Sequence, residues 1–462
     1  MRRSALAVLT LAGCVTAPVP PIGTEPDVPP GGTAEALAAF DTTSNGFTDT
    51  ATFAADLEEF EGVETIADGL GPVYNAQSCR ECHQTPGTGG ASQVTEFRAG
   101  HRDPQGRFVA PRVPIARGTA FIEGRTLIND RAICPNGAFP DEEIQEHVPD
   151  IDTIRTFRLS LPVLGDGLVE AIPDDLLRGL SERQCKETQG QICGLVVEVP
   201  VLEAEGKYRI GRFGWKNQQA SLLSFAADAY LNEMGITSRL QPDEATTICD
   251  TVKDPEDNPP AEPSRAARAQ ARTKSATASA AAAEAPVADI DRFARFMRAS
   301  KAPPRDTTLA VTDPAKRGSQ QFDKVGCATC HVRTLVTAPE GHKINGGQLA
   351  VPAALASRVF HPFGDFLLHD VGTGDGIEVS VLEHHGRKYA YMQEQMSPTT
   401  NRIRTAPLWG LRTRSRLMHD GESPTLRDAI KRHRGEANDA RRRFDMLNEQ
   451  EQADLLTFLQ SL

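Results

Sequence analysis

The chain has 462 residues, of which 39% are hydrophobic and 24% charged, and its formal net charge is -12 at pH 7. This length is enough for two or three domains, and the composition is typical of a soluble globular protein rather than a disordered one. The acidic balance argues against a nucleic-acid partner, and it is explained either by a basic partner protein or by solubility alone.

The first 14 residues have the layout of a secretory signal, because two arginines precede a short apolar run that ends in LAGC at Cys14. Small residues before a cysteine resemble the lipobox of bacterial lipoproteins, in which Cys14 becomes the lipidated N-terminus. An ordinary signal peptide with an unrelated cysteine is the alternative. Residues 15–33 are rich in proline and glycine and predict a tether. We therefore expect an exported protein, held by a lipid anchor on the periplasmic side of the cell envelope.

Beyond the tether, helical patterns occur over residues 33–40 and 53–66. Residues 105–215 are mixed, with Pro/Gly turns between apolar segments. Two of these segments, 194–202 and 207–215, are β-rich and predict strands.

The second half of the chain is expected to be more helical. Residues 219–235 have apolar positions at helical spacing and end at a glycine, which favours a helix stop. Residues 254–287 are dominated by alanine, proline and serine and predict a linker or a surface excursion. Helical patterns return at 289–300 and directly before residue 327, and the chain closes with an amphipathic helix over 448–462.

Two copies of the pattern C-x-x-C-H stand out among the nine cysteines. They consist of Cys79, Cys82 and His83, and of Cys327, Cys330 and His331. Two thiols at this spacing can add across the vinyl groups of a haem, and the adjacent histidine can then bind the iron. A zinc site would group four ligands closely, and a thioredoxin-like dithiol would not need the histidine. The pattern therefore predicts two covalently bound haems c, with His83 and His331 as iron ligands.

Four further cysteines lie between the two motifs, at positions 134, 185, 193 and 249. An even number in an exported protein indicates two disulfides. Cys185 and Cys193 flank a plausible short hairpin, which favours a local bridge between them and leaves Cys134 to pair with Cys249.

Together these features predict a mainly α protein built from two cytochrome c-like haem domains, of which the first carries β-rich insertions. The expected organisation is a signal over 1–14, a tether over 15–33, an N-terminal haem domain over 34–253, a linker over 254–287 and a C-terminal electron-transfer cytochrome c domain over 288–462.

Several longer motifs recur in chain order: SCRECHQTPGTGG, GDGLVEAIPDD, GRFGWKNQQASL, NEMGITS, FLLHDVG, TAPLWGLR, MHDGESPTLRDAI and HRGEA. In these motifs the chain resembles the di-haem oxidoreductase family, whose members are described as peroxidases and sometimes as thiol oxidoreductases. The resemblance runs from about residue 40 to the end. A more distant likeness connects the chain with bacterial di-haem cytochrome c peroxidases and their MauG-like relatives.

The peroxidase likeness implies roles around the C-terminal, electron-transfer haem. In those enzymes an HDG segment precedes the distal methionine of that haem. The segment here starts at His419, and the corresponding position is occupied by His433, which implies a bis-histidine haem held by His331 and His433. A surface histidine is the alternative for His433. His419 is then expected to lie near the haem without binding iron, and His369 to bond a propionate.

The likeness also implies residues around the N-terminal, peroxidatic haem. Trp215 corresponds to a tryptophan between the two haems, and Glu233 to the distal acid that moves protons during peroxide cleavage. The alternatives are a core aromatic for Trp215 and a solvent-facing helix-end acid for Glu233. His101, Met392 and Met396 are candidates for a sixth iron ligand.

We therefore expect an exported di-haem c-type oxidoreductase, in which electrons pass from the C-terminal to the N-terminal haem to reduce peroxide or a similar oxidant. The alternative is a non-catalytic, membrane-tethered di-haem electron carrier with both irons six-coordinate. The expected partners are hydrogen peroxide or a similar small oxidant and a redox protein of the cytochrome or cupredoxin type. The peroxidase likeness also suggests bound calcium.

Overall fold

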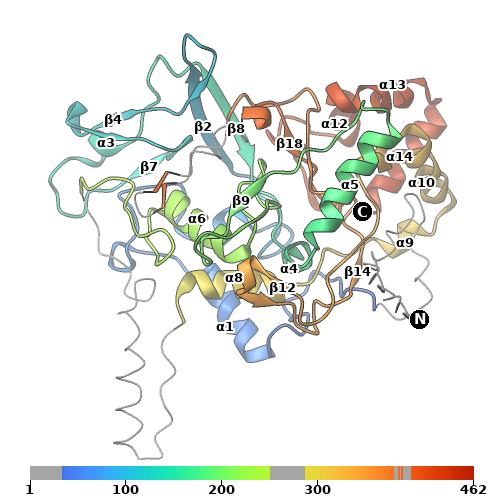
Figure 1. Ribbon diagram of the computed structural model, residues 1–462, viewed down its shortest axis with the longest axis horizontal. Helices are drawn as coiled ribbons and strands as arrows, with labels where there is room; N and C mark the ends of the chain where they lie inside the picture. Colours follow the sequence, from blue (N-terminus) through green and yellow to red (C-terminus); the bar gives the residue numbers. More distant parts are fainter. Residues whose placement is uncertain (1–33, 250–286, 379–382, 385–386, 389–396) are drawn as a thin grey trace, which may run out of the picture.

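The computed structural model describes residues 34–249, 287–378, 383–384, 387–388 and 397–462 (Figure 1). The expected signal, the tether and nearly all of the expected linker lie outside the described residues. The same holds for Cys14, Met392 and Met396. Every helix within the described part of the chain is too short or too polar to serve as a membrane span.

The helices are α1 (Thr50–Glu61), α2 (Cys79–Cys82), α3 (Asp141–Ile144), α4 (Asp166–Glu170), α5 (Asp174–Glu187), α6 (Leu222–Met234), α8 (Asp289–Ala299), α9 (Thr307–Ala310), α10 (Asp313–Val325), α12 (Leu426–Arg432), α13 (Asn438–Met446) and α14 (Glu449–Gln460). The strands before the second haem motif are β1 (Val73–Tyr74), β2 (Thr95–Arg102), β3 (Phe108–Val109), β4 (Val113–Ile115), β5 (Ala120–Ile122), β6 (Leu127–Ile128), β7 (Arg131–Ala132), β8 (Ile154–Leu159), β9 (Glu198–Pro200) and β10 (Tyr208–Ile210). Those after it are β11 (Leu335–Val336), β12 (Lys343–Ile344), β13 (Leu349–Ala350), β14 (Val359–Phe360), β15 (Leu368–His369), β16 (Glu383–His384), β17 (Arg387–Lys388) and β18 (Ile403–Arg404).

The expectation of a mainly α fold is only partly confirmed. The structure is 34% helix and 16% strand, and its strands form several small antiparallel sheets. The largest described sheet has four strands, with β2 pairing β3, β6 and β8. In Figure 1 this sheet lies on the opposite side of the view from α10, α12, α13 and α14.

The core of the N-terminal half forms where α8 packs against α1 and α6. Phe60 and Phe296 bring their ring centroids within 4.6 Å, and Tyr230 meets Phe293 edge-on at 5.3 Å. Buried aromatic side chains contribute much of the free energy of folding, because each removes a large apolar area from water. This aromatic cluster fixes the three helices beside the first haem motif. Although α8 follows the predicted linker in the sequence, it belongs to this core.

A second core forms in the C-terminal part, where α10 and α14 lie in close contact. Gly318 on α10 allows this approach, since a Cβ atom there would lie 1.9 Å from the carbonyl oxygen of Asp454. Phe322 packs against Phe458 with ring centroids 5.3 Å apart. Gly326 then ends α10 in a left-handed conformation with φ of 97°, so the chain turns directly into the second haem motif.

Most elements predicted from the sequence are confirmed. The pattern over 53–66 belongs to α1, which ends at Gly62, and the pattern over 219–235 is α6 with Gly235 as its left-handed C-cap. The two predicted strands are the antiparallel pair β9 and β10. The helix predicted over 33–40 is wrong: Glu35 and Ala38 instead form parallel bridges to Val359 and Ala302. Tertiary pairing overrides a weak local preference there.

Both predicted disulfides are present, Cys134–Cys249 and Cys185–Cys193. The predicted hairpin between Cys185 and Cys193 is wrong, because Cys185 lies in the last turns of α5. The bridge therefore ties a helix end to the loop that follows it. The Cys134–Cys249 bridge joins residues 115 positions apart and closes a small core beneath the sheet formed by β2.

Candidate functional site: two adjoining cavities

The first C-x-x-C-H motif lines a cavity of about 420 Å³. Cys79 and Cys82 begin and end the single turn of α2, and His83 follows as its C-cap. This turn presents all three side chains to one space. Burial lowers the pKa of His83 to about 4, although the carbonyls of Gly90 and Leu161 oppose the shift. The imidazole is therefore neutral at pH 7, which is the form that binds iron.

The second motif lines a separate cavity of about 190 Å³, which also contains His433. His331 Nδ1 lies 3.0 Å from the carbonyl oxygen of Phe363, and His433 Nδ1 lies 2.7 Å from that of Ala429. Each Nδ1 therefore donates to the backbone and leaves its Nε2 available. Burial and the neighbouring His433 lower the pKa of His331 to about 4, and burial also lowers that of His433. Both rings line this cavity.

The chemistry of these residues fits haem better than either alternative. All four motif cysteines are free of disulfides, and burial raises the pKa of each thiol. A reactive dithiol would need a lowered thiol pKa. A zinc site would bring the two cysteine pairs together, whereas the pairs line different cavities. Paired thiols, a neutral histidine and an adjoining cavity at each motif are what two haems require.

Trp215 and Arg404 line both cavities. Trp215 is buried, and its Nε1–H donates to the carbonyl of Leu159 at 2.7 Å. Its indole meets the ring of His419 edge-on with centroids 6.0 Å apart. His419 itself lines the second cavity. Trp215 therefore lies on the wall that the two cavities share.

A buried ion-pair network holds Trp215 in place through its neighbour Lys216. Lys216 Nζ lies 2.9 Å from Asp375, which also pairs with Arg158 at 2.7 Å. Lys216 donates further hydrogen bonds to backbone carbonyls, including that of Arg402 at 2.8 Å. Burial alone would raise the pKa of Asp375, but these two cations lower it, so the network stays charged at neutral pH.

Glu233 lies at the C-terminal end of α6 and lines the first cavity. Its Oε2 accepts a hydrogen bond of 2.8 Å from Asn75. Burial, followed by the charge of Glu96, raises the pKa of Glu233 to about 8. Glu96 on β2 stays ionised, because Arg98 Nε and Nη2 donate to its carboxylate at 2.6 and 2.9 Å. Two carboxyl groups of opposite protonation state therefore share one wall of this cavity.

Other histidines named from the sequence lie elsewhere. His101 on β2 pairs with the buried Asp152 at 2.7 Å and lines neither cavity. His369 lines the second cavity, but its Nδ1 lies 2.7 Å from Glu436 and its Nε2 lies 3.0 Å from Asp365. A haem propionate could bond His369 only by replacing one of these carboxylates.

Sequence reasoning did not find Glu96 and Arg404. Glu96 and Arg98 alternate with outward positions on β2 and form an ordinary surface-like pair in the sequence. Only the tertiary structure brings Glu96 beside Glu233 on the wall of the same cavity. Arg404 likewise carries no local signal, because its importance comes from its place between two separate cavities.

The comparison with protein families agrees with two haem sites. The sequence pattern of the family described as "Di-haem oxidoreductase, putative peroxidase" matches residues 136–462. A comparison with curated protein sequences finds no match. A solved hydrazine synthase from Kuenenia stuttgartiensis is 13% identical, with 97% of this chain and 99% of that chain covered and a TM-score of 0.37. A MauG-like protein associated with microbial copper homeostasis is 18% identical, with 39% of this chain and 54% of that chain covered and a TM-score of 0.24. The family pattern covers most of the chain, including the second motif, Trp215, Glu233 and Arg404, so this protein belongs to the di-haem oxidoreductase family.

Proposed function

We propose that the protein is an exported di-haem c-type oxidoreductase that reduces hydrogen peroxide or a similar small oxidant at its first cavity. The difference between the two cavities carries this proposal. The second cavity is lined by His331 and His433, which would hold the iron of a haem bound there from two histidines. Within the described residues, His83 is the single histidine of the first cavity, which has the carboxyl pair Glu96 and Glu233 in addition. A site with one strong ligand and acid–base groups suits a reaction, whereas two strong ligands suit electron transfer.

Haem attached at each motif supplies the redox chemistry, with electrons passing from the C-terminal site to the N-terminal one. Cys79, Cys82 and His83 would hold one haem, and Cys327, Cys330 and His331 with His433 the other. Reduction of hydrogen peroxide to two waters consumes two electrons and two protons. A redox protein of the cytochrome or cupredoxin type would supply the electrons.

The carboxyl pair Glu96 and Glu233 in the first cavity would carry out the proton transfer to the substrate. Glu233 is largely protonated at pH 7, because burial and Glu96 raise its pKa to about 8. It can donate this proton to an oxygen of the substrate and recover it afterwards, and the hydrogen bond from Asn75 holds its carboxyl group in place. Glu96, paired with Arg98, keeps its charge and so favours the protonated form of Glu233.

Trp215 lies on the wall between the two sites. The residue is 8% exposed, and its indole N–H donates to the Leu159 carbonyl. An aromatic side chain that lines both cavities would shorten the path of electron transfer between haems bound in them. The ion pairs of Lys216 and Arg158 with Asp375 hold the backbone next to Trp215 in place.

The exported location is supported by the two disulfides, since such bonds persist mainly in oxidising compartments. Lipidation at Cys14 would hold the protein at the membrane surface. Calcium binding, which the peroxidase likeness suggests, remains a prediction.

A non-catalytic electron carrier is the second candidate. It would need a second strong ligand in the first cavity, and the thioethers of Met234 and Met297 line that cavity. Electron paramagnetic resonance of the oxidised and half-reduced protein separates the two candidates. A high-spin signal beside one low-spin bis-histidine signal supports the enzyme. Two low-spin signals that do not change when peroxide is added would favour the electron carrier.

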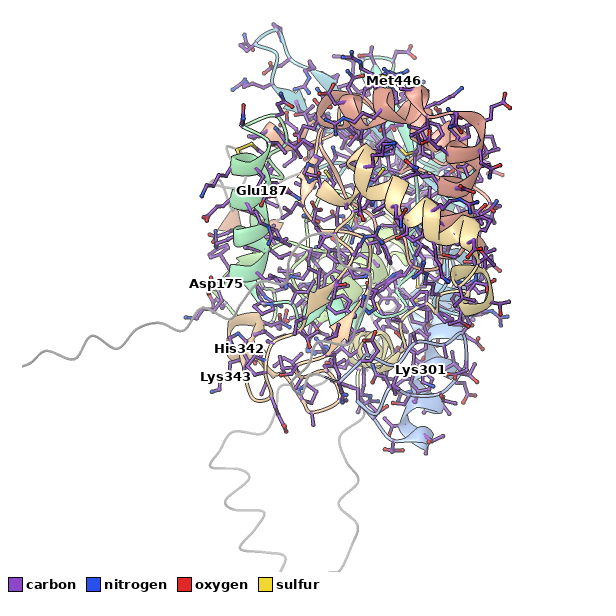
Figure 2. The ribbon with its side chains drawn as sticks, turned by 90° about the vertical axis from the view of Figure 1, so that its right-hand side faces the viewer. Asp175, Glu187, Lys301, His342, Lys343 and Met446 are labelled. Carbon is purple, nitrogen blue, oxygen red and sulfur yellow. A yellow bond between two sulfur atoms is a disulfide. The ribbon has the colours of Figure 1, made fainter. Side chains whose placement is uncertain are left out.

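Replacing Glu233 tests the proposal directly. Glu233→Gln removes the proton donor but keeps the size of the side chain, and we expect peroxide turnover to fall by about 100-fold or more. Glu187→Gln is the matched control, because Glu187 is exposed on the outside of α5, away from both cavities (Figure 2). Stopped-flow assays with a reduced cytochrome would measure both. Unchanged turnover in Glu233→Gln would remove Glu233 from the mechanism.

A further inference from the structure

Arg404, on β18, is a buried cation at the junction of the two cavities. It is 6% exposed, and it shares with Trp215 the property of lining both spaces. Its strand pairs with β15, which places Arg404 opposite Leu368. The position is therefore set by backbone pairing, and it does not depend on a flexible loop.

The inner part of this side chain is firmly held. The backbone N–H of Arg404 donates to the carbonyl of Trp215 at 2.9 Å, and its Nε donates to that of Gly214 at 3.0 Å. Its guanidinium also lies over the ring of Phe366, with 5.8 Å to the centroid. These contacts use one N–H of the guanidinium and tie it to the turn that carries Trp215.

The two terminal nitrogens of the Arg404 guanidinium differ from its Nε, which is hydrogen-bonded. Within the described residues, the two terminal nitrogens of Arg404 make no hydrogen bond and no ion pair. Two other buried arginines do have carboxylates: Arg158 pairs with Asp375 at 2.7 Å, and Arg298 pairs with Glu170 at 2.6 Å.

Burial lowers the pKa of Arg404 to about 10, which still leaves it charged at pH 7. Asp166, which lines the first cavity, is the acidic group that attracts Arg404, but burial raises the pKa of Asp166 to about 8, so this group is largely neutral at pH 7. A buried charge without an ionised counter-ion is costly, so an anion is expected beside Arg404.

The haems provide such anions. Each haem carries two propionate carboxylates, and a guanidinium presents two terminal N–H groups in a fork that suits carboxylate oxygens. We propose that Arg404 is a shared anchor for propionates of the two haems and that its charge raises the reduction potential of both. This inference rests on the two haems of the proposed function and is independent of the oxidant.

The electrostatic consequence follows from the sign of the charge. Reduction adds an electron to each haem, and a nearby positive charge in a medium of low dielectric constant favours that step. A single cation between two haems acts on both, whereas a residue that lines one cavity acts mainly on one. Loss of Arg404 should therefore lower both potentials together.

The test compares Arg404→Gln and Arg404→Lys with Arg412→Gln in the full haem-loaded protein. Arg412 is the matched control, because it lines neither cavity and donates to the carbonyls of Pro304 and Leu462. Spectroelectrochemical titration should show the reduction equilibrium of each haem in Arg404→Gln weakened on the order of tenfold. Arg404→Lys, which keeps the charge, should shift less, and Arg412→Gln should leave both potentials unchanged.

A shift of one potential alone, or of neither, would overturn the shared anchor. If Arg404→Gln does not fold, Arg404→Lys still gives an answer through resonance Raman spectroscopy. The propionate bending bands should change for both haems while the bands of the axial ligands stay constant, and unchanged propionate bands would contradict the proposal. If both potentials shift in Arg404→Gln but the protein does not react with peroxide, the role of Arg404 stands and the peroxidase function is wrong.

Discussion

The two cavities are built around the same five-residue pattern, yet their walls differ. The first is larger, about 420 Å³ against 190 Å³, and is lined by carboxylates and arginines. The second is mostly apolar apart from its histidines, Arg404 and Arg441, and part of its wall comes from α10 and α14. The comparison teaches that the two sites share the motif that predicts haem, while residues far away in the sequence give each site different surroundings.

The largest expected effect comes from removing one attachment motif. In Cys79→Ser/Cys82→Ser the first site loses both thiols, so covalent haem should fall from two per chain to one. The matched variant Cys327→Ser/Cys330→Ser should lose the other haem. Mass spectrometry of the intact chain measures this loss. Retention of two covalent haems in either variant would show that the motif is not the attachment site.

A second variant makes the C-terminal site more like that of a His/Met cytochrome. His433→Met should raise the potential of one haem by a sizeable part of the roughly 0.8 V range that axial ligands cover, because thioether ligands favour the reduced iron. The other potential should move little. Redox titration followed by optical spectroscopy measures both, and an unchanged pair of potentials would mean that His433 is no ligand.

A third variant acts on the carboxyl pair that distinguishes the first cavity. Glu96 raises the pKa of Glu233, so Glu96→Gln should lower that pKa and move the alkaline limb of the activity profile down by about 1 pH unit. The sign follows because the proton donor is lost as pH rises through its pKa. An activity profile from pH 5 to 10 measures the shift. An alkaline limb that stays in place would show that Glu96 does not influence the pKa of Glu233.

The smallest expected effect concerns His101, which the sequence offered as a ligand but which lines neither cavity. His101→Ala should leave the spectra and turnover unchanged. It removes the partner of the buried Asp152, so the free energy of unfolding should fall by about 1–3 kcal/mol. Chemical denaturation checks the stability. A change in the spin state of either haem in His101→Ala would instead show that His101 is an iron ligand.

Much of the local structure could be predicted from the sequence. The attachment motifs, α6 with its stop at Gly235 and the nearby Cys185–Cys193 bridge depend on residues that lie close together in the chain. The failed helix over 33–40 shows the limit of this reasoning. Its residues bridge to Ala302 and Val359, so partners far along the chain determine its conformation.

By itself the sequence predicted haem, the family and the candidate iron ligands, because the C-x-x-C-H pattern places two thiols and a histidine at the short fixed spacing that haem attachment needs. Only the tertiary structure decided the surroundings of each site. It brought Glu96 to Glu233, and it placed Trp215 and Arg404 between the two cavities. Desolvation and the interaction between buried charges depend on which distant segments meet in space, and no local pattern of residues encodes that meeting.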